Sequence, residues 1–594
     1  METVNITING QSIDAPAGST ILDAAKQAGI DIPTLCHHPA LQPAGACRIC
    51  AVEIKGQRVL QTACTFPIAE GMEVQTESPR VIGARKLVLD LLFSERNHFC
   101  PFCEMSGNCE LQSLGYRYRL DHWAYPTYTH RFPVDASHKY LLMDHNRCVL
   151  CGRCIRGCSE IVANHTLGLR QRGARTMVHA DMGVPWRDST CIVCGTCAQL
   201  CPTGTLTDKR SSFAGRDAQM NYTRSTCSQC SVGCGIKIVT RNDSVQRIEG
   251  DWDAGVNGGL LCQMGRFAPL FDQRERVAAP LLMRNGRQET AGWEEALAVV
   301  AQHIGGRGAE LGVLTTTHAT NEALYMAGRL FRSDLKTDNI GLIHETMPRW
   351  FGKPDGTFDD FEKSDLIVLA GADPAKDQPV ASFLVKRSVD RGARLIVADD
   401  GENGLAPFAF LCLGMNGIQQ AVEIAERAEK PVVLYGARLT RAAADALKRL
   451  RGKAAFVGLE PGMNTRAARA YGLDKGFSPL AARVLYLLLG EQNWDGEELL
   501  AKVPEGTFVV VQSSFVSPLT RKADVVLPMA VWSERGGSLT NTEGRVLTVN
   551  RAVDPAGEAK PDWEILALVA SRLGVKVGSS LSDLSAQAAE EFTT

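Results

Sequence analysis

The sequence C-V-L-C-G-R-C-I-R-G-C at residues 148–158 is matched in spacing by C-I-V-C-G-T-C-A-Q-L-C at residues 191–201. Each run has the form Cys-x2-Cys-x2-Cys-x3-Cys, and Pro202 follows the second run. Thiolates at this spacing hold 4Fe–4S clusters, and the fourth cysteine of each run binds the cluster of the other run. The two runs therefore predict two neighbouring clusters.

The crossing of the fourth cysteines decides the expected ligand sets. The ligands expected for one cluster are Cys148, Cys151, Cys154 and Cys201. Those expected for its neighbour are Cys191, Cys194, Cys197 and Cys158. Structural zinc also uses Cys-x2-Cys pairs, but it needs neither two interlocked runs of four nor a following proline. The runs resemble those of bacterial ferredoxins, which implies a double-cluster ferredoxin domain over residues 138–212.

Three arginines lie close to the first run of cysteines: Arg147, Arg153 and Arg156. They form either a solvated basic face or a positive charge that eases the reduction of a negative cluster. The sequence alone leaves both interpretations open.

The chain has 594 residues, which implies several domains, and its formal net charge is −2. Such a balance argues against a nucleic-acid partner or an anchor to an anionic membrane. No window approaches 18 consecutive apolar residues, and the first residues lack the regions of a secretory signal. Of 20 cysteines, 19 lie at or before Cys262 in metal-binding spacings, so we expect a reducing, cytoplasmic compartment.

Residues 1–78 begin with a hairpin signal, because residues 4–8 alternate in polarity and the turn residues Asn9 and Gly10 follow. Four cysteines come next, with gaps of 10, 2 and 13 residues: Cys36, Cys47, Cys50 and Cys64. This pattern resembles the 2Fe–2S ferredoxin domain at the front of the large iron–sulfur subunit of respiratory complex I. It differs from the plant-type Cys-x4-Cys-x2-Cys spacing. The resemblance implies a 2Fe–2S cluster, and the alternative is a zinc site on a ubiquitin-like sheet.

Residues 79–137 contain a helical pattern over 84–93 and then three cysteines with gaps of 2 and 5 residues: Cys100, Cys103 and Cys109. Three thiolates leave a 4Fe–4S cluster one ligand short. His98 is the expected fourth ligand, since imidazole can replace thiolate on iron. We expect the other nearby histidines, His122, His130 and His138, to be ordinary surface or turn residues.

The histidine motif carries a second resemblance. The complex I large iron–sulfur subunit has His-x3-Cys at this place, whereas this chain has His-x-Cys. The short form E-x-N-H-x-C at residues 95–100 resembles the diaphorase small subunit of soluble NAD-reducing hydrogenases. The first 212 residues as a whole resemble that subunit more than they resemble complex I.

Residues 220–275 carry four cysteines with gaps of 2, 3 and 27 residues: Cys227, Cys230, Cys234 and Cys262. Alternating segments on either side of Asn242 and Asp243 predict two strands. The segment is similar to the small 4Fe–4S domain that begins molybdopterin oxidoreductases. In the catalytic members of that family a lysine lies between the cluster and the pterin, and Met264 replaces it here. A bound molybdopterin is therefore not expected.

Residues 276–594 predict an α/β body, because continuous apolar runs alternate with helical patterns. The runs expected as strands are 311–314, 366–369, 395–397, 432–435, 508–511 and 525–527, and the helical patterns include 381–391 and 442–450. The body resembles a truncated molybdopterin oxidoreductase. Residues 337–344 offer no metal ligand of the family's kind, and little sequence remains for a cap domain after Gly574. We expect Cys412 to be a buried core thiol.

The expected fold class is thus a set of α+β iron–sulfur domains followed by an α/β molybdopterin-oxidoreductase-like body. One 2Fe–2S cluster and four 4Fe–4S clusters make an electron conductor, and the chain lacks a convincing dinucleotide fingerprint. Because NADH gives electrons in pairs, a flavin must separate them on a partner chain. The resemblance implies an electron-transfer subunit of a soluble NAD(P)H-linked oxidoreductase complex.

The expected partners are an NADH-binding FMN/iron–sulfur flavoprotein subunit and a small 2Fe–2S subunit. A hydrogenase, a formate dehydrogenase or another redox module is a further candidate partner. Two alternatives remain for the function. One is a catalytic molybdenum or tungsten formate dehydrogenase subunit, and the other is the large iron–sulfur subunit of membrane-bound complex I itself.

Overall fold

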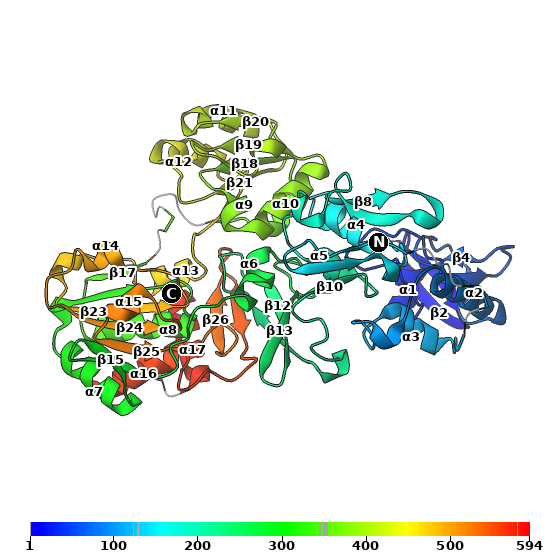
Figure 1. Ribbon diagram of the computed structural model, residues 1–594. Coiled ribbons are helices and arrows are strands. Elements are labelled where there is room, and N and C mark those ends of the chain that lie inside the picture. The colour runs from blue at the N-terminus through cyan, green and yellow to red at the C-terminus, as the bar shows by residue number, and fades with distance from the viewer. Residues whose placement is uncertain are drawn as a thin grey trace. The chain divides into compact units, whose positions relative to one another are not determined.

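The computed structural model describes residues 2–122, 124–126, 131–343, 346–347, 354–578 and 580–593 (Figure 1). The chain divides into two compact units, Met1–Met220 and Asn221–Thr594. In the described ranges, none of the helices combines the length and the apolar character that a membrane span requires.

The first unit begins with a five-stranded sheet in the order β2-β1-β5-β3-β4. Its strands are β1 (Thr3–Ile8), β2 (Gln11–Pro16), β3 (Ala51–Ile54), β4 (Gln61–Thr62) and β5 (Glu73–Gln75). The predicted hairpin is present, with β1 and β2 antiparallel and φ angles of 51° at Asn9 and 84° at Gly10. Positive φ at both positions is what a type I′ turn needs. Helix α1 (Ile21–Gln27) begins at Thr20 and packs on this sheet.

Two helices follow the sheet. They are α2 (Pro79–Glu95) and α3 (Glu110–Arg117). Helix α2 contains the predicted helical stretch 84–93, and it begins at Ser78, whose hydroxyl accepts the N–H of Val81. Leu89 of α2 and Leu111 of α3 belong to one buried cluster. The two helices therefore hold the cysteine-bearing segment between them in place.

The remainder of the first unit repeats one backbone shape around the two cysteine runs. Its elements are β6 (Val134–Asp135), β7 (Leu141–Asp144), α4 (Arg153–Arg156), β8 (Leu167–Arg170), β9 (Met177–Ala180), α5 (Thr196–Leu200) and β10 (Leu206–Asp208). Gly152 and Gly195 precede α4 and α5 with φ angles of 70° and 72°. Leu150 and Val193, two residues earlier, also have positive φ, at 52° and 59°. Both runs therefore turn back on their cysteines in the same way.

The second unit begins with a three-stranded antiparallel sheet in the order β11-β12-β13. Its strands are β11 (Asn221–Thr226), β12 (Gly235–Arg241) and β13 (Ser244–Gly250), and α6 (Gln263–Arg266) follows. The two predicted strands are confirmed, and Asn242 and Asp243 turn between them with φ angles of 50° and 54°. This small sheet presents the loops that carry Cys227, Cys230, Cys234 and Cys262.

A seven-stranded sheet forms the larger part of the body, in the order β15-β14-β25-β24-β23-β16-β17. Its strands are β14 (Leu281–Arg284), β15 (Arg287–Thr290), β16 (Leu311–Thr315), β17 (Ile340–Leu342), β23 (Val484–Gly490), β24 (Phe508–Ser513) and β25 (Val525–Pro528). Strands β17, β16, β23, β24 and β25 are parallel, whereas β14 is antiparallel to both of its neighbours.

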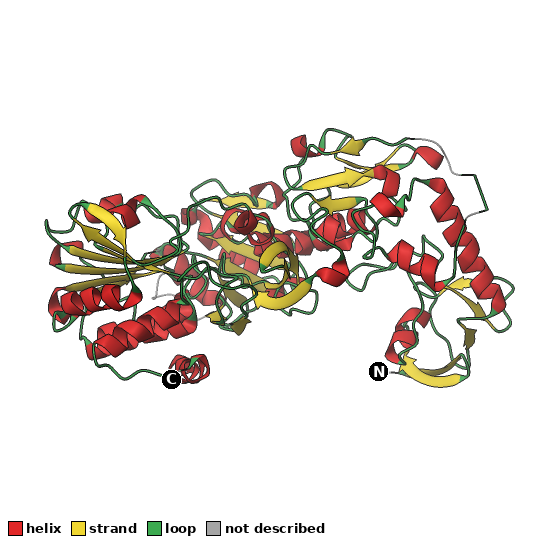
Figure 2. Cartoon of the chain, turned by 60° about the horizontal axis from the view of Figure 1, so that its bottom comes forward, coloured by secondary structure: helices red, strands yellow, loops and turns green. Residues whose placement is uncertain are grey.

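Helices cover both faces of this sheet (Figure 2). On one face lie α7 (Trp293–Ile304), α8 (Asn321–Ala327), α13 (Thr465–Ala470), α16 (Asp562–Arg572) and α17 (Leu581–Thr593), and on the other α14 (Glu497–Leu500) and α15 (Pro518–Lys522). Tyr486 of β23 belongs to the first core and its neighbour Leu487 to the second. The expectation of parallel strands buried on both faces is confirmed. The hairpin β26 (Gly537–Thr540) and β27 (Val546–Val549) completes this part.

A second, all-parallel sheet has the order β20-β19-β18-β21-β22. Its strands are β18 (Leu366–Ala370), β19 (Arg394–Ala398), β20 (Leu411–Leu413), β21 (Pro431–Tyr435) and β22 (Ala455–Gly458). Its helices are α9 (Pro374–Asp377), α10 (Pro379–Asp390), α11 (Ile418–Ala425) and α12 (Arg441–Leu447). All six runs expected as strands are strands, and the helical patterns correspond to α10 and α12.

Two expectations about single residues are wrong. Cys412 is exposed and lies on β20, which is an edge strand of its sheet. His138 is buried, because its ring packs against Trp186 with 4.6 Å between ring centroids. His122 is exposed, as expected, and its Nδ1 lies 2.6 Å from the carboxylate of Asp121. His130 lies outside the described residues.

Candidate iron–sulfur sites

The first four cysteines form two touching pairs, called here the 2Fe–2S site (Cys36, Cys47, Cys50 and Cys64). The backbone N–H of Cys36 donates to the sulfur of Cys47 at 3.4 Å, and the two sulfurs of Cys50 and Cys64 are 3.4 Å apart. The hydrogen bond between Cys50 and Cys64 lowers the pKa of Cys50 to about 7. Hydrogen bonds with Cys36 raise the pKa values of Cys47 and Cys64. The four sulfurs are thus gathered at one place, as the sequence pattern requires.

The second group, called here the His98 site (His98, Cys100, Cys103 and Cys109), lines one cavity. Nε2 of His98 is buried in it and has no hydrogen-bond partner among the described residues. The ring also interacts with the backbone carbonyl of Leu92, so the other nitrogen is the one that donates. Burial lowers the pKa of His98 to about 4, which leaves its free nitrogen unprotonated. A neutral imidazole with an orphaned nitrogen beside three thiols fits a metal ligand.

The third group, called here ferredoxin site A (Cys148, Cys151, Cys154 and Cys201), also lines one cavity. Burial raises the pKa of Cys151 to about 12 and raises that of Cys148. Each of the first three thiols is affected electrostatically by Cys201, which comes from the second run. The structure therefore brings the fourth cysteine of the second run to the cavity of the first.

The fourth group, called here ferredoxin site B (Cys158, Cys191, Cys194 and Cys197), mirrors site A. The N–H of Val193 donates to the Cys191 sulfur at 3.4 Å, just as the N–H of Leu150 donates to the Cys148 sulfur at 3.4 Å. Burial raises the pKa of Cys191 to about 11. Cys158 acts electrostatically on the thiols of the second run, so the crossing is reciprocal.

Two of the three arginines near these sites, Arg153 and Arg156, are not part of a solvated basic face. Arg153 is 4% exposed, and it donates to both carboxylate oxygens of Glu110, at 2.6 and 2.8 Å. Cys151 and Cys201 act on its charge electrostatically, which places Arg153 beside site A. Arg156 donates to the backbone carbonyl of Cys36. The positive charges therefore lie among the candidate sites.

The fifth group, called here the small-domain site (Cys227, Cys230, Cys234 and Cys262), lines a cavity in the second unit. Burial raises the pKa of Cys227 to about 12. Met264, which replaces the family lysine, lines this cavity and is half exposed. Lys376 of α9 lines it as well. An amino group is thus present at this site, although it comes from another part of the chain.

Three of the five groups each line a cavity. Zinc requires four sulfurs within about 2.3 Å of a single point. In the His98 site, ferredoxin site A and the small-domain site, the four candidate ligands lie on the walls of one cavity. In the described part of the chain, no group of three or more His, Cys, Asp or Glu side chains is arranged to hold a single metal ion.

Sequence reasoning missed three side chains near these sites. Trp186 and His138 lie beside Cys191, and Lys376 lies at the small-domain cavity. None of them belongs to a cysteine motif. Only the fold brings them close to the cysteines. The sequence therefore carries no signal for Lys376. For His138, the one hint is its position at the start of the predicted ferredoxin domain.

The fold and the five cysteine groups define an iron–sulfur electron-transfer subunit of an oxidoreductase. The chain belongs to the molybdopterin oxidoreductase family, whose model matches residues 276–572, and its front is of the kind found in the large iron–sulfur subunit of NADH-quinone oxidoreductase.

Four other family models match the front of the chain. They describe a 2Fe-2S iron-sulfur cluster binding domain at residues 1–79, a NADH-ubiquinone oxidoreductase-G iron-sulfur binding region at 85–123, a ferredoxin-like domain of NADH-quinone oxidoreductase subunit 3 at 139–207, and a molybdopterin oxidoreductase Fe4S4 domain at 220–271. Domains that bind 2Fe–2S and 4Fe–4S clusters are therefore present.

Similar proteins carry related names. NADH-quinone oxidoreductase subunit 3 of Thermus thermophilus is 28% identical, over 96% of this chain and 83% of its own length. NADPH-Fe(3+) oxidoreductase subunit alpha of Geobacter sulfurreducens is 27% identical, over 96% of this chain and 81% of its own length. A chain of a solved NAD+-reducing [NiFe]-hydrogenase is 35% identical, over 36% of this chain and 90% of that chain, with a TM-score of 0.34.

Proposed function

We propose that this chain relays single electrons through one 2Fe–2S cluster and four 4Fe–4S clusters, in a soluble, NAD(P)H-linked complex. Each cluster is held by the four side chains of one site described above, with His98 as the single non-sulfur ligand. The observation that carries the proposal is the gathering of 19 cysteines and one histidine into five groups of four. Clusters with four protein ligands on their outer face have no free position for substrate, which suits a conductor.

Contacts within the first unit support a continuous relay. Cys154 of ferredoxin site A acts electrostatically on Cys197 of site B. A methyl group at Gly204, three residues after Cys201, would lie 2.7 Å from the sulfur of Cys103. The segment of site A therefore touches the His98 site. Arg156 of α4 donates to the backbone carbonyl of Cys36. This contact connects the 2Fe–2S site to the helix that carries part of ferredoxin site A.

The carboxyl ends of the seven-stranded sheet support a body without its own cofactor. In parallel sheets of this kind, ligands bind in the crevice between two neighbouring strands from which the chain continues to opposite sides of the sheet. Here those strands are β16, which is followed outward by β17, and β23, which is followed outward by β24. Arg535 lies there, but it donates to the buried carboxylate of Asp562 at 2.9 Å and to the carbonyl of His318. Gln492, which follows β23, contacts His318. Side chains of the protein thus bridge the crevice, and the arginine is already paired.

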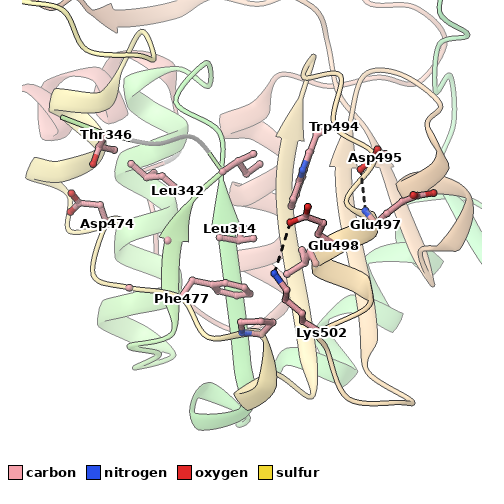
Figure 3. A pocket seen from close by; sticks show the side chains of 15 residues that line it. Leu314, Leu342, Thr346, Asp474, Phe477, Trp494, Asp495, Glu497, Glu498 and Lys502 are labelled. Carbon is pink, nitrogen blue, oxygen red and sulfur yellow. Dashed lines mark hydrogen bonds and ion pairs between the residues drawn. The ribbon is translucent and has the colours of Figure 1, made fainter. Parts of the chain in front are cut away.

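A large pocket beside β16 and β17 also suits an anionic cofactor poorly (Figure 3). Its volume is about 1010 Å³. The charged side chains that line it are Asp474, Asp495, Glu497, Glu498 and Lys502. Among the described residues of the lining, Lys502 carries the one amine, and it lies 3.9 Å from the carboxylate of Glu498. Negative charge on this lining opposes the pyrophosphate of a pterin dinucleotide, which supports the proposal that molybdopterin is absent.

The electron source then lies on other chains. NADH gives a hydride, so a flavin must divide the electron pair before single-electron carriers accept it. We therefore place the NADH site on an FMN/iron–sulfur flavoprotein partner, next to a small 2Fe–2S subunit. A hydrogenase, a formate dehydrogenase or another redox module exchanges electrons at the far end. None of the 20 cysteines forms a disulfide, which suits a reducing cytoplasm.

Anaerobic reduction tests this assignment. In the native complex, NADH or NADPH should reduce the clusters of this chain, as seen by electron paramagnetic resonance (EPR). The purified chain alone should be reduced by dithionite but not by either nucleotide. Direct reduction of the isolated chain by NAD(P)H, or formate-dependent reduction together with stoichiometric molybdenum or tungsten, would contradict the proposal.

A further inference from the structure

A buried histidine directs one N–H toward ferredoxin site B. Nδ1 of His138 accepts the backbone N–H groups of Tyr140 and Leu141, at 3.1 and 3.0 Å. A nitrogen that accepts carries no proton, so the neutral ring carries its proton on Nε2. Nε2 lies 4.0 Å from the sulfur of Cys191. The backbone of the protein therefore fixes which ring nitrogen faces the sulfur, and fixes it as the donor.

A tryptophan places a second N–H near the same sulfur. Trp186 is 1% exposed, and its ring lies against that of His138 at an interplanar angle of 37°. Its indole nitrogen has no partner of regular hydrogen-bond geometry among the described residues. It nevertheless lies close enough to Cys191 to lower the pKa of that thiol as a donor. A thiolate is a stronger acceptor than a thiol, so a loaded cluster would strengthen both contacts.

We propose that His138 and Trp186 are positioning residues that donate two N–H···S hydrogen bonds to Cys191 and thereby raise the reduction potential of the cluster at ferredoxin site B. The inference rests on the proposed role of Cys191 as a ligand. Donors to a cluster sulfur stabilise the more negative, reduced cluster, and hydrogen bonds to the sulfurs are one of the factors that set cluster potentials.

The neighbouring site shows that this feature is specific. Cys148 occupies the place in site A that Cys191 occupies in site B, with the same backbone N–H···S contact. Beside Cys148 the hydroxyl of Thr205, which lowers the pKa of that thiol, stands where a pair of ring nitrogens stands beside Cys191. The two sites therefore have the same backbone conformation around this cysteine, but different side chains lie beside its sulfur. The reduction potential of each cluster can thus be set separately.

Two variants remove one donor each and keep most of the packing. In His138→Asn, the amide oxygen can still accept the backbone N–H two residues ahead, but nothing donates from the position of Nε2. In Trp186→Phe, an aromatic ring remains and the N–H is lost. The matched control is His179→Asn, because His179 lies in the same domain and its Nδ1 contacts the carbonyl of Ala180 rather than a thiol.

The measurement is an EPR-monitored redox titration of the native complex. At a fixed ambient potential, each variant should lower the ratio of reduced to oxidised site B cluster by up to about tenfold. This corresponds to a decrease of up to about 59 mV in the reduction potential of that one-electron cluster. Site A and the His179→Asn control should not shift. Pulsed electron–nuclear double resonance in deuterated water should show exchangeable protons coupled to reduced site B in the unmodified complex, and fewer in each variant.

The outcomes separate this inference from the assignment on which it rests. Unchanged site B potentials in both variants would overturn it, as would loss of the cluster in both, since that would show a structural role. If one of the two donor variants loses the site B cluster, the reduction potential measured in the other variant decides: a lowered potential supports the inference and an unchanged one overturns it. Cys191→Ser tests the ligand: an unaltered site B spectrum would refute the assignment itself. An altered spectrum together with unshifted potentials in the two donor variants would refute only the hydrogen bonds.

Discussion

A methyl group at Gly157 would lie 2.2 Å from Cδ1 of Leu200. Gly157 precedes Cys158, the last cysteine of the first run, and Leu200 precedes Cys201, the last of the second. The two runs therefore pack against each other directly before the cysteines that cross between sites. The absence of a side chain at 157 allows this approach, and the approach lets each run give its fourth thiol to the other cavity.

Gly157→Ala should therefore damage both ferredoxin sites together. The added methyl group overpacks a buried contact, at a cost of about 1–3 kcal/mol. We expect weaker EPR signals from sites A and B and an unchanged signal from the 2Fe–2S site. Gly83→Ala in α2 is the control, because no atom lies within 4 Å of the added group. Full signals from both sites in Gly157→Ala would show that the contact is not required.

The role of His98 can be tested by two replacements. His98→Cys should keep a 4Fe–4S centre with an altered spectrum, because thiolate can take the place of imidazole on iron. His98→Ala should damage that centre alone. The exposed His122 offers the control variant His122→Ala, which should change nothing. A normal spectrum in His98→Ala would remove His98 from the ligands.

Loading of the sites should depend on pH. Burial raises the pKa values of Cys109, Cys151 and Cys227 to about 12, so these thiols hold their protons at pH 7 before loading. Iron binds thiolates, so loading must release protons and occupancy must fall as pH falls. Anaerobic reconstitution in weak buffer should acidify the solution. Loading without proton release would contradict this expectation.

The folding stability of the cluster-free chain should fall as pH rises, whereas cluster occupancy should fall as pH falls. Its buried thiols have folded-state pKa values of about 12, above the ordinary value of 9.0. Their contribution to stability is complete below about pH 9 and is lost as pH rises from there through 12. The free energy of unfolding of the cluster-free chain in urea should therefore decline above pH 9. A rise in stability over that window would show that the thiols are ionised in the folded chain.

The pair formed by Arg535 and Asp562 should stabilise the body rather than bind a ligand. The two side chains are 2% and 0% exposed and lie 2.9 Å apart. Arg535→Met leaves a buried carboxylate without its cation, at a cost of about 3–5 kcal/mol. Urea unfolding followed by tryptophan fluorescence measures the loss. Arg572→Met, which removes an exposed ion pair with Glu294, should cost less than about 1 kcal/mol. Equal effects of the two variants would contradict this account.

Much of the fold follows from local sequence patterns. The Asn9-Gly10 turn fixes the first hairpin, and continuous apolar runs identify most strands of both body sheets. The apolar run that forms β23, Val484–Gly490, was not predicted. This run is rich in leucine rather than in β-branched residues, so its composition does not separate a buried strand from a buried helix.

The cysteine spacings predict the groups of side chains that the structure brings together, because at least two cysteines of every group recur at a gap of 2 residues. Side chains that act on a ligand from elsewhere follow no such rule. His138 lies 53 residues from Cys191 in the sequence. Lys376 lies on α9, which follows a strand of the all-parallel sheet, whereas the cysteines near it flank the small β11-β12-β13 sheet. Cys412 was misplaced because the apolar sequence around it does not show that β20 is an edge strand.

The most direct test of the central claim is the metal content of the anaerobically purified chain. One two-iron and four four-iron clusters give about 18 iron atoms per chain, with a matching amount of acid-labile sulfide and negligible zinc or molybdenum. Iron near ten atoms, stoichiometric zinc, or molybdenum bound with a pterin would contradict the account of a five-cluster electron relay.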